Sequence, residues 1–363
     1  MTNKEMEQLF FDLTDYTYIY GYEDEIFEKH LSKHLKRDSF GNYFIKVGDS
    51  KTIFTCHLDT VGKQKLKVNR EVYTKEGHRF IKTDGNTILG GDDKAGVVIM
   101  MNMIDNNVPG LYYFFLGEEK GTVGSGLLVK NMFKMVSEYD RCVAFDRHAY
   151  GSIITRQMGK NCCSKEFAEK LSEEFAKNGM EYKADPYGVW TDSALFMGLV
   201  PECTNISVGY FNEHTKDEEQ DLDYMLQLAN TAIKIDWENL VTVRIKENFD
   251  TEDPKEEHKI TDLPLYKLHK IFDEVEDAIY DINHTFASNA NFFKPEKEMT
   301  FFSVKDLDGE KNLSVFIHSD GSITLKKKDV TLDFKNLGIF LRLGESKRLK
   351  KLLRFKYSVN IVE

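Results

Sequence analysis

The sequence lacks the features that mark membrane, secreted and disulfide-linked proteins. No segment approaches the roughly 18 consecutive apolar residues that a membrane-spanning helix needs. The first residues carry no apolar run of the kind found in a secretory signal peptide. The five cysteines are odd in number and show no Cys-x-x-Cys spacing, which argues against a disulfide framework and against a zinc ribbon. These absences predict a cytoplasmic protein without a membrane partner.

An excess of positive charge is also absent. The formal net charge is -11, so no nucleic-acid partner is expected. Hydrophobic residues make up 41% of the chain and charged residues 30%, which is typical of a globular protein. The 363 residues are enough for two domains with a large core.

Apolar periodicity predicts an α/β fold for the first two thirds of the chain. Residues 3–35 are predicted to be helical, and a short strand pair is predicted over 39–56. Strands are then predicted at 52–56, 111–116, 141–146, 151–158 and 203–210, separated or followed by helices at 95–105, 124–136, 165–178, 191–197 and 220–236. This alternation predicts a twisted, mostly parallel sheet with helices on both faces.

A charged stretch that contains Pro254 separates this region from a part of different character. We expect a first domain over 1–245, a linker over 246–260 and a small α+β domain over 261–363. The elements predicted in the small domain are a helix at 263–282, strands at 299–306, 312–318 and 322–328, helices from about 333 and around 346–353, and a last strand near 355–361.

Acidic residues and histidines recur where predicted strands end. In open α/β sheets the carboxyl ends of the strands meet at one edge, which is where such folds carry their chemistry. Each of these side chains is unremarkable alone, but together they are candidate ligands for two divalent metal ions. The candidate ligands are His57, Asp92, Glu119, Asp146 and His214.

Several of these residues have a local alternative. His57 can offer an imidazole nitrogen to a metal, or it can be a hydrogen-bonded histidine at the end of a strand. Asp59, two positions further on, faces the same way on an extended chain and suits a carboxylate that holds the tautomer of His57. Asp92 and Asp93 lie in a glycine-rich turn, where either can cap the following helix instead of binding a metal.

Glu118 and Glu119 are adjacent acids that follow a predicted strand. Two neighbouring carboxylates repel each other strongly unless cations neutralise them. One glutamate is therefore expected to bind a metal, and the other is expected to accept a proton from water during catalysis.

The motifs His-x-Asp-Thr, Gly-Asp-Asp-Lys-Ala-Gly, Gly-Glu-Glu and a late His-Thr together resemble the di-zinc exopeptidase superfamily. This superfamily includes peptidase T-like tripeptidases and bacterial leucyl-type aminopeptidases. The resemblance implies that His57 and Asp146 bind one metal and that Glu119 and His214 bind the other. It also implies that the carboxylate of Asp92 bridges the two metals.

The resemblance assigns further roles around the metals. It implies a cis peptide bond between Asp92 and Asp93. It implies that Glu118 is the general base of the reaction. It also implies that Asp59 orients His57.

The resemblance covers about residues 20–238 and departs from the family in one respect. Peptidase T-like enzymes carry a large lid or dimerisation domain between the fourth and last ligands. Here only residues 147–213 lie between Asp146 and His214. A lid-less aminopeptidase architecture is therefore expected, although the Asp-Asp-Lys-Ala-Gly turn is more similar to the lidded branch. The residue that would stabilise the oxyanion is left unassigned.

The function that the resemblance implies is a metal-dependent exopeptidase for short peptides, either an aminopeptidase or a di- or tripeptidase. Two alternatives remain: a deacylase of the same fold that acts on N-acyl or other amides, and a scaffold without activity. Zinc is the expected ion because imidazole and carboxylate ligands suit it, with cobalt or manganese as alternatives. The C-terminal domain is expected to gate the site or to mediate oligomerisation.

Overall fold

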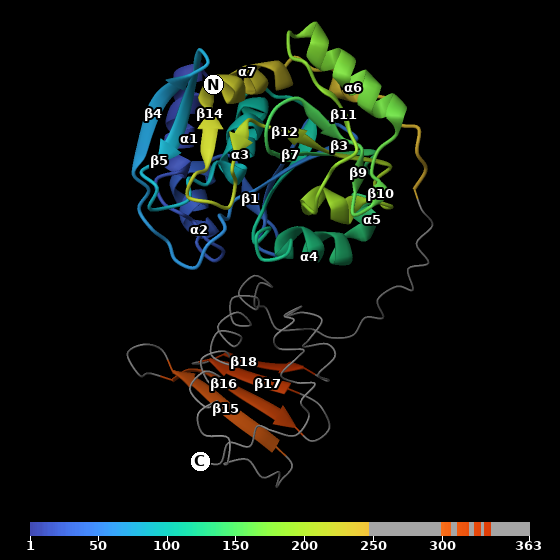
Figure 1. The fold of residues 1–363 in the computed structure, drawn as a ribbon. Coiled ribbons are helices and arrows are strands. Elements are labelled where there is room, and N and C mark those ends of the chain that lie inside the picture. The colour runs from blue at the N-terminus through green and yellow to red at the C-terminus, as the bar shows by residue number, and fades with distance from the viewer. Residues whose placement is uncertain (247–298, 306–310, 319–322, 328–329, 335–363) are drawn as a thin grey trace. The chain divides into compact units, whose positions relative to one another are not determined.

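The computed structural model describes residues 1–246 and four strands within residues 299–334, at 299–305, 311–318, 323–327 and 330–334 (Figure 1). The chain divides into two compact units, Met1–Thr251 and Glu252–Glu363. All candidate site residues belong to the first unit. Among the described residues, none of the helices combines the length and the apolar character that crossing a membrane requires.

An eight-stranded sheet forms the centre of the first unit. Its order is β1 (Lys36–Arg37), β2 (Tyr43–Val47), β6 (Gly110–Phe115), β3 (Thr52–His57), β7 (Arg141–Arg147), β12 (Glu202–Ser207), β8 (Ser152–Ile154) and β11 (Lys183–Asp185). The four central strands β6, β3, β7 and β12 are parallel to one another. Antiparallel pairs occur only towards the two edges of this sheet. The predicted mostly parallel α/β sheet is therefore confirmed.

Helices cover both faces of this sheet. Alternate side chains of a strand point to opposite sides, and in the central strands the side chains on both sides are buried. On one face, Phe54 of β3 stacks on Tyr112 of β6 and meets the edge of Trp237. On the other face, Phe115 of β6 packs against Phe196. Every residue of β3 and β6 is buried, which explains their nearly continuous apolar runs.

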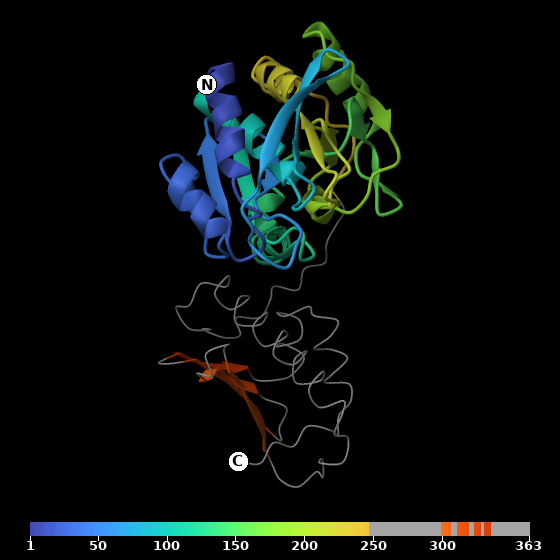
Figure 2. The ribbon, with the colours of Figure 1, turned by 60° about the vertical axis from the view of Figure 1, so that its left-hand side comes forward.

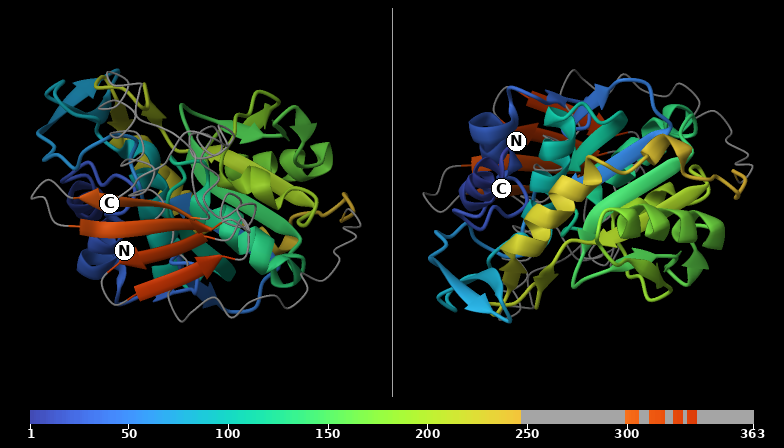
Figure 3. Two further views of the ribbon diagram at one scale, coloured as in Figure 1. Left: turned by 90° about the horizontal axis from the view of Figure 1, so that it is seen from below. Right: turned by 90° about the horizontal axis from the view of Figure 1, so that it is seen from above.

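The first face is covered by α1 (Asn3–Leu13), α3 (Gly91–Asp105) and α7 (Leu222–Ala232), whose buried residues join one core cluster. Helix α3 lies beside α7 and is buried along nearly its whole length (Figure 3). The other face carries α4 (Val123–Asn131), α5 (Phe133–Val136) and the short 3-10 helix η2 (Asp192–Phe196). The remaining long helix, α6 (Lys165–Lys177), packs on β8 and β11.

A second, antiparallel sheet stands beside α1 and α7 (Figure 2). Its order is β13 (Tyr210–Phe211), β14 (Glu219–Asp221), β5 (His78–Thr83) and β4 (Arg70–Lys75). The side chain of Arg79 donates to Glu7 of α1, which ties this sheet to the N-terminal helix. The periodicity of the sequence did not predict the β4–β5 hairpin.

The structure corrects the predictions for the N-terminal segments. Residues 3–35 are not one helix, because α1 ends at Leu13. A short helix α2 (Glu23–Ile26) and a π-helical turn (Phe27–Leu31) follow. They come after Gly21, whose φ of 93° does not fit a helix. The strand pair predicted over 39–56 is wrong, because β6 lies between β2 and β3 and pairs with both.

The described residues of the second unit form an antiparallel sheet of β15 (Met299–Lys305), β16 (Lys311–His318), β17 (Ile323–Lys327) and β18 (Val330–Phe334), in chain order. The three predicted strands are confirmed. The helix predicted from about 333 is wrong at its start, because Val330–Phe334 pairs with β17. The predicted helix at 263–282, most of the linker and the elements predicted beyond 334 lie outside the described residues.

Candidate metal centre

Three of the candidate ligands lie at the same edge of the central sheet. His57 is the last residue of β3, and Asp146 is the last but one of β7. Glu119 follows β6 after a short turn. Because β3 lies between β6 and β7 and is parallel to both, the carboxyl ends of the three strands meet at this edge.

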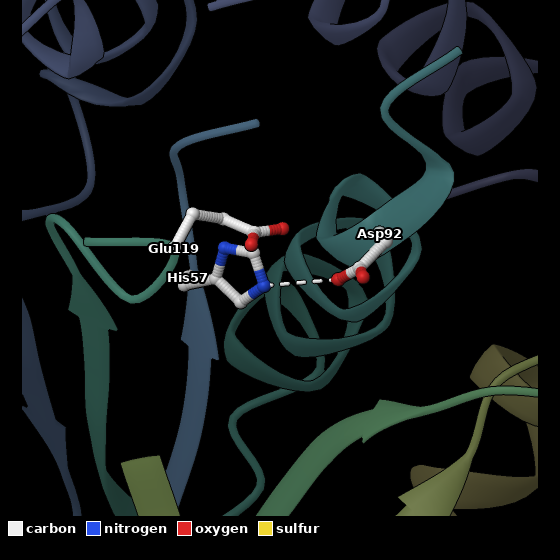
Figure 4. Close-up of side chains that lie close together, drawn as sticks. All are labelled: His57, Asp92 and Glu119. Atoms are coloured by element: carbon white, nitrogen blue, oxygen red, sulfur yellow. Dashed lines mark hydrogen bonds and ion pairs between the residues drawn. The ribbon is translucent and has the colours of Figure 1, made fainter. Parts of the chain in front are cut away.

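Asp92 lies between the two candidate histidines. It belongs to the first turn of α3, whereas His214 lies in the loop after β13. The Asp92 oxygen Oδ1 is 3.0 Å from Nε2 of His57 (Figure 4), and its Oδ2 is 3.1 Å from Nε2 of His214. One carboxylate therefore faces two imidazoles that come from segments far apart in the sequence.

Each imidazole also meets one further carboxylate. Nε2 of His57 is 3.5 Å from Oδ1 of Asp146, and Nε2 of His214 is 2.9 Å from Oε1 of Glu119. The structure thus brings all five candidate ligands together. The pairs have the arrangement that the family resemblance implies, with Asp92 common to both.

The aspartates of the glycine-rich turn have different partners. Asp93 accepts the backbone N–H of Gly96 at 3.1 Å and that of His57 at 3.2 Å, so it caps the regular part of α3. The carboxylate of Asp92 faces the histidines instead. The peptide bond between Asp92 and Asp93 is cis, as the resemblance implies.

His57 is buried, with 1% of its surface exposed. Its Nδ1 is 3.1 Å from the carbonyl oxygen of Asp59, so Nδ1 carries a proton and Nε2 is the nitrogen that faces the acids. Burial opposes protonation of the ring, but contacts with Asp146, Asp59 and Asp92 raise the pKa of His57 well above its usual value.

His214 is half exposed, and its backbone has a φ of 64°. Its contacts with Asp92 and Glu119 raise the pKa of the His214 ring to about 11. In the absence of metal, protons on the two imidazoles therefore balance part of the acidic charge. Because a histidine binds a metal only in its neutral form, a bound metal would displace these protons.

Asp59 contacts the glutamate turn as well as His57. Its two carboxylate oxygens accept the backbone N–H groups of Glu118 at 3.0 Å and of Glu119 at 3.1 Å. The side-chain oxygen nearest to His57 Nδ1 is 3.5 Å away, further than the Asp59 carbonyl. Asp59 therefore approaches His57 mainly through its backbone and holds the glutamate turn with its carboxylate.

A second buried carboxylate holds the same turn. Glu23, which the sequence reasoning did not single out, accepts the N–H of Gly117 at 3.2 Å. Together with the two bonds to Asp59, three successive backbone amides of this turn donate to buried carboxylates. The turn that carries Glu118 is thus anchored to two distant parts of the chain.

Glu118 lies in buried, acidic surroundings. Burial raises the pKa of its carboxyl group well above the usual range, and the charges of Asp146 and Asp192 add to this, whereas His57 opposes it. A carboxylate with a raised pKa can take up a proton near neutral pH.

Sequence reasoning missed other polar residues that surround the candidate ligands. Thr191 donates from Oγ1 to Oδ2 of Asp146 at 2.5 Å. Lys94, fully buried, donates from Nζ to the Asp59 carbonyl at 3.0 Å. Lys94 was visible within the Asp-Asp-Lys motif, and Thr191 stands at the start of a predicted helix, but neither pattern indicated these contacts.

The glycine-rich turn before α3 depends on its small residues. Gly90 has a φ of 78°, and a Cβ there would lie 2.9 Å from Oγ1 of Thr60. Close approach of the turn to its neighbours therefore requires glycine. The turn is also held by Glu218, a residue that the sequence reasoning missed, whose carboxylate accepts the N–H groups of Gly90 and Asp92.

The donor set fits divalent metal ions. Around a tetrahedral Zn²⁺ with nitrogen and oxygen ligands, neighbouring ligand atoms lie about 3.3 Å apart. The nitrogen–oxygen separations described above run from 2.9 to 3.5 Å. Among the described residues, the buried Oε1 of Glu119 has no other polar partner than Nε2 of His214, which is itself a candidate ligand. Ligand atoms of His57, Asp92 and Glu119 all lie within 4.8 Å of one another.

Sequence comparisons find little similarity to known proteins. No family model matches the chain. The uncharacterized protein YqjE of Bacillus subtilis (strain 168) is 37% identical over 86 residues, which cover 22% of this chain and 22% of that protein. The chain thus matches about a fifth of the length of this relative.

Structure comparisons show the fold. Aminopeptidase PepT from Bacillus cereus ATCC 10987 is similar with a TM-score of 0.53 and 17% identity, covering 64% of this chain and 98% of that chain. A tripeptidase from Staphylococcus aureus subsp. aureus Mu50 is similar with a TM-score of 0.51 and 16% identity, covering 65% of this chain and 98% of that chain. The chain therefore has the α/β fold found in these two proteins.

Proposed function

We propose that this chain is a metal-dependent exopeptidase that hydrolyses short peptides, as an aminopeptidase or a di- or tripeptidase. Asp92 carries this proposal, because its two carboxylate oxygens face His57 and His214. A cluster of this kind at the carboxyl edge of a parallel sheet is suited to hydrolysis with two metals. The shared fold of an aminopeptidase and a tripeptidase is consistent with this reaction.

The five candidate ligands would hold two metal ions. His57 and Asp146 would bind one ion, Glu119 and His214 the other, and Asp92 both. Divalent ions bound there would lower the pKa of a water molecule and polarise the carbonyl of the substrate. Zinc suits this set of imidazole and carboxylate ligands, with cobalt or manganese as alternatives.

Glu118 is the proton carrier of the proposed reaction. It accepts a proton from the attacking water and returns it to the nitrogen of the leaving amine, so that the carboxylate is regenerated. Asp59 keeps Glu118 in place by accepting its backbone N–H and contacts the ring of His57 through its own carbonyl oxygen.

A substrate panel tests the proposal against its alternatives. The full chain would be assayed with zinc, cobalt or manganese on di- and tripeptides and aminoacyl chromogenic substrates, each with a free and with an acetylated amino group. We expect hydrolysis of the free-amine compounds. Cleavage of the acetylated compounds alone would identify a deacylase. Total inactivity without bound metal would identify a scaffold and overturn the proposal.

For the chain as a whole, we propose a catalytic domain over 1–245 without an inserted lid, a linker over 246–260 and an accessory domain over 261–363. The accessory domain is proposed to gate the site or to mediate oligomerisation. Light scattering of the full chain measures its oligomeric state directly. A monomer at all concentrations would contradict a role of the accessory domain in oligomerisation.

A further inference from the structure

Glu218 connects the two segments that carry Asp92 and His214. Its carboxylate is fully buried and accepts the backbone N–H of Gly90 at 2.7 Å and that of Asp92 at 3.0 Å. In the sequence it lies four positions after His214 and directly before β14. One side chain thus joins the loop of one candidate ligand to the backbone of another.

The position of Glu218 is itself held firmly. The next residue, Glu219, begins β14, where it pairs with Lys82 of β5 in the antiparallel sheet. On the opposite side, a Cβ at Gly91 would lie only 3.3 Å from Oε1 of Glu218. Glycine at position 91 therefore leaves room for the carboxylate to approach the turn. The pairing of β14 with β5 and the narrow gap at Gly91 together determine where the two N–H groups are held.

The carboxyl group of Glu218 suits this position because it has two acceptor oxygens. Oε2 accepts the N–H of Gly90 and Oε1 accepts that of Asp92, so each backbone group has its own oxygen. A side-chain amide offers only one acceptor oxygen, so it could not hold both N–H groups in this way.

We propose that Glu218 is a positioning residue of the metal centre: by holding the N–H groups of Gly90 and Asp92, it directs the Asp92 carboxylate towards both histidines and so strengthens metal binding. This inference rests on the proposed function, because it takes Asp92 as a metal ligand. Glu218 does not touch the substrate or the metals in this view. Its effect passes through the backbone of the turn.

The test compares Glu218→Gln with Glu219→Gln in the full chain. Glutamine keeps one acceptor oxygen but presents an NH₂ group to the second backbone N–H, so one of the two bonds is lost. The control residue Glu219 lies next in sequence, and its carboxylate contacts Lys75 and Tyr73 instead of the turn. Zinc affinity would be measured by competition with a chromophoric chelator, and the Co²⁺ absorption spectrum would report the ligand geometry.

We expect Glu218→Gln to bind zinc about 10–100-fold more weakly than wild type, with a changed cobalt spectrum, and Glu219→Gln to match wild type. A purely structural role would lower the melting temperature of the metal-free protein and leave the zinc affinity of the folded protein unchanged. If Glu218→Gln does not fold, Gly91→Ala replaces it in the test. The methyl group of the alanine would press on the carboxylate of Glu218, so we expect weaker zinc binding in this variant too.

The outcomes separate this inference from the proposed function. Provided that wild type binds metal, two results would overturn the inference. One is an unchanged zinc affinity of the folded Glu218 variant. The other is an equal loss of zinc affinity in the Glu219 control. Where Gly91→Ala replaces the Glu218 variant, unchanged affinity in that folded protein overturns it equally. Absence of zinc and cobalt binding by wild type would overturn the proposed function, and the inference with it.

Discussion

The carboxylate of Asp59 accepts the backbone N–H of Glu118 at 3.0 Å, although 58 residues separate them. Its other oxygen accepts the N–H of Glu119 at 3.1 Å. Asp59 follows β3 and the two glutamates follow β6, so neighbouring parallel strands bring these groups together. The residue that contacts His57 therefore also sets the position of the proposed base and of a candidate ligand.

Replacing Asp59 by asparagine tests this double contact. One of the two glutamate N–H groups loses its acceptor, because the amide nitrogen of asparagine is a donor. We expect kcat on a short peptide to fall at least about tenfold while the protein stays folded. Steady-state kinetics, together with the metal content of the same sample, measure the effect. A kcat within twofold of wild type would contradict it.

Glu118→Gln is expected to keep its metal and to lose at least about two orders of magnitude in kcat, because the general base is removed. Turnover and metal content would be measured on the best substrate of the panel. Lys120→Gln, two positions away on an exposed side chain, is the matched control and should behave as wild type. Near wild-type turnover of Glu118→Gln would show that another group is the base.

His57→Ala and Asp92→Ala are each expected to abolish tight binding of at least one metal ion. Each variant removes a donor atom from the cluster, and Asp92 faces both histidines. Elemental analysis after gel filtration measures the metal per chain. His34→Ala, an exposed histidine outside the cluster, is the control. Two ions per chain in Asp92→Ala would refute its assignment as the bridging ligand.

The raised pKa of Glu23 predicts how the free energy of unfolding depends on pH. Burial, aided by the charge of Asp59, raises the pKa of Glu23 from 4.5 to about 8. Between these values the folded protein holds a proton that the unfolded chain releases, so rising pH lowers the free energy of unfolding. The slope is at most about 1.4 kcal/mol per pH unit for one group.

Glu23→Gln removes this titration. The free energy of unfolding of wild type minus that of the variant should therefore decrease from pH 5 to pH 8. Urea denaturation of the metal-free proteins across this range measures the difference. A difference that is constant with pH would rule out a raised pKa for Glu23.

Two glycines of α4 differ sharply in the space around them. A Cβ at Gly124 would lie 2.0 Å from Oδ1 of Asn42 and 2.8 Å from the carbonyl oxygen of Leu116. Gly124→Ala should therefore lower the free energy of unfolding by about 1–3 kcal/mol or more. At Gly126 the nearest atom is Cδ1 of Leu195 at 3.7 Å, so Gly126→Ala should be neutral or slightly stabilising. Equal melting temperatures of the two variants would contradict this difference.

Apolar periodicity located the central elements well because it reports burial directly. The strand predicted at 52–56 is Thr52–His57, and the helix predicted at 165–178 is Lys165–Lys177. Strand β3 is buried throughout and shows one short run of apolar and β-branched residues, whereas α6 has one buried stripe and shows the helical period.

Elements with weaker burial were missed or paired wrongly. Strand β4 has no buried residue, and two of the buried residues of β5, Phe80 and Ile81, are adjacent, so neither strand alternates clearly between buried and exposed side chains. The strands at 43–47 and 52–57 are close in sequence, yet β6 separates them. Pairing depends on which apolar faces fit in the core, and distance along the chain does not report that.

The α/β class of the first unit and the residue types that follow its central strands can be read from the chain alone, because strand periodicity and strand ends are local features. Which atoms meet depends on the three-dimensional fold. It separated Asp92, which faces two histidines, from Asp93, which caps α3. It also joined Glu218 to the Asp92 backbone. Such contacts form over about 3 Å between segments distant in the chain, so they depend on packing that no local pattern records.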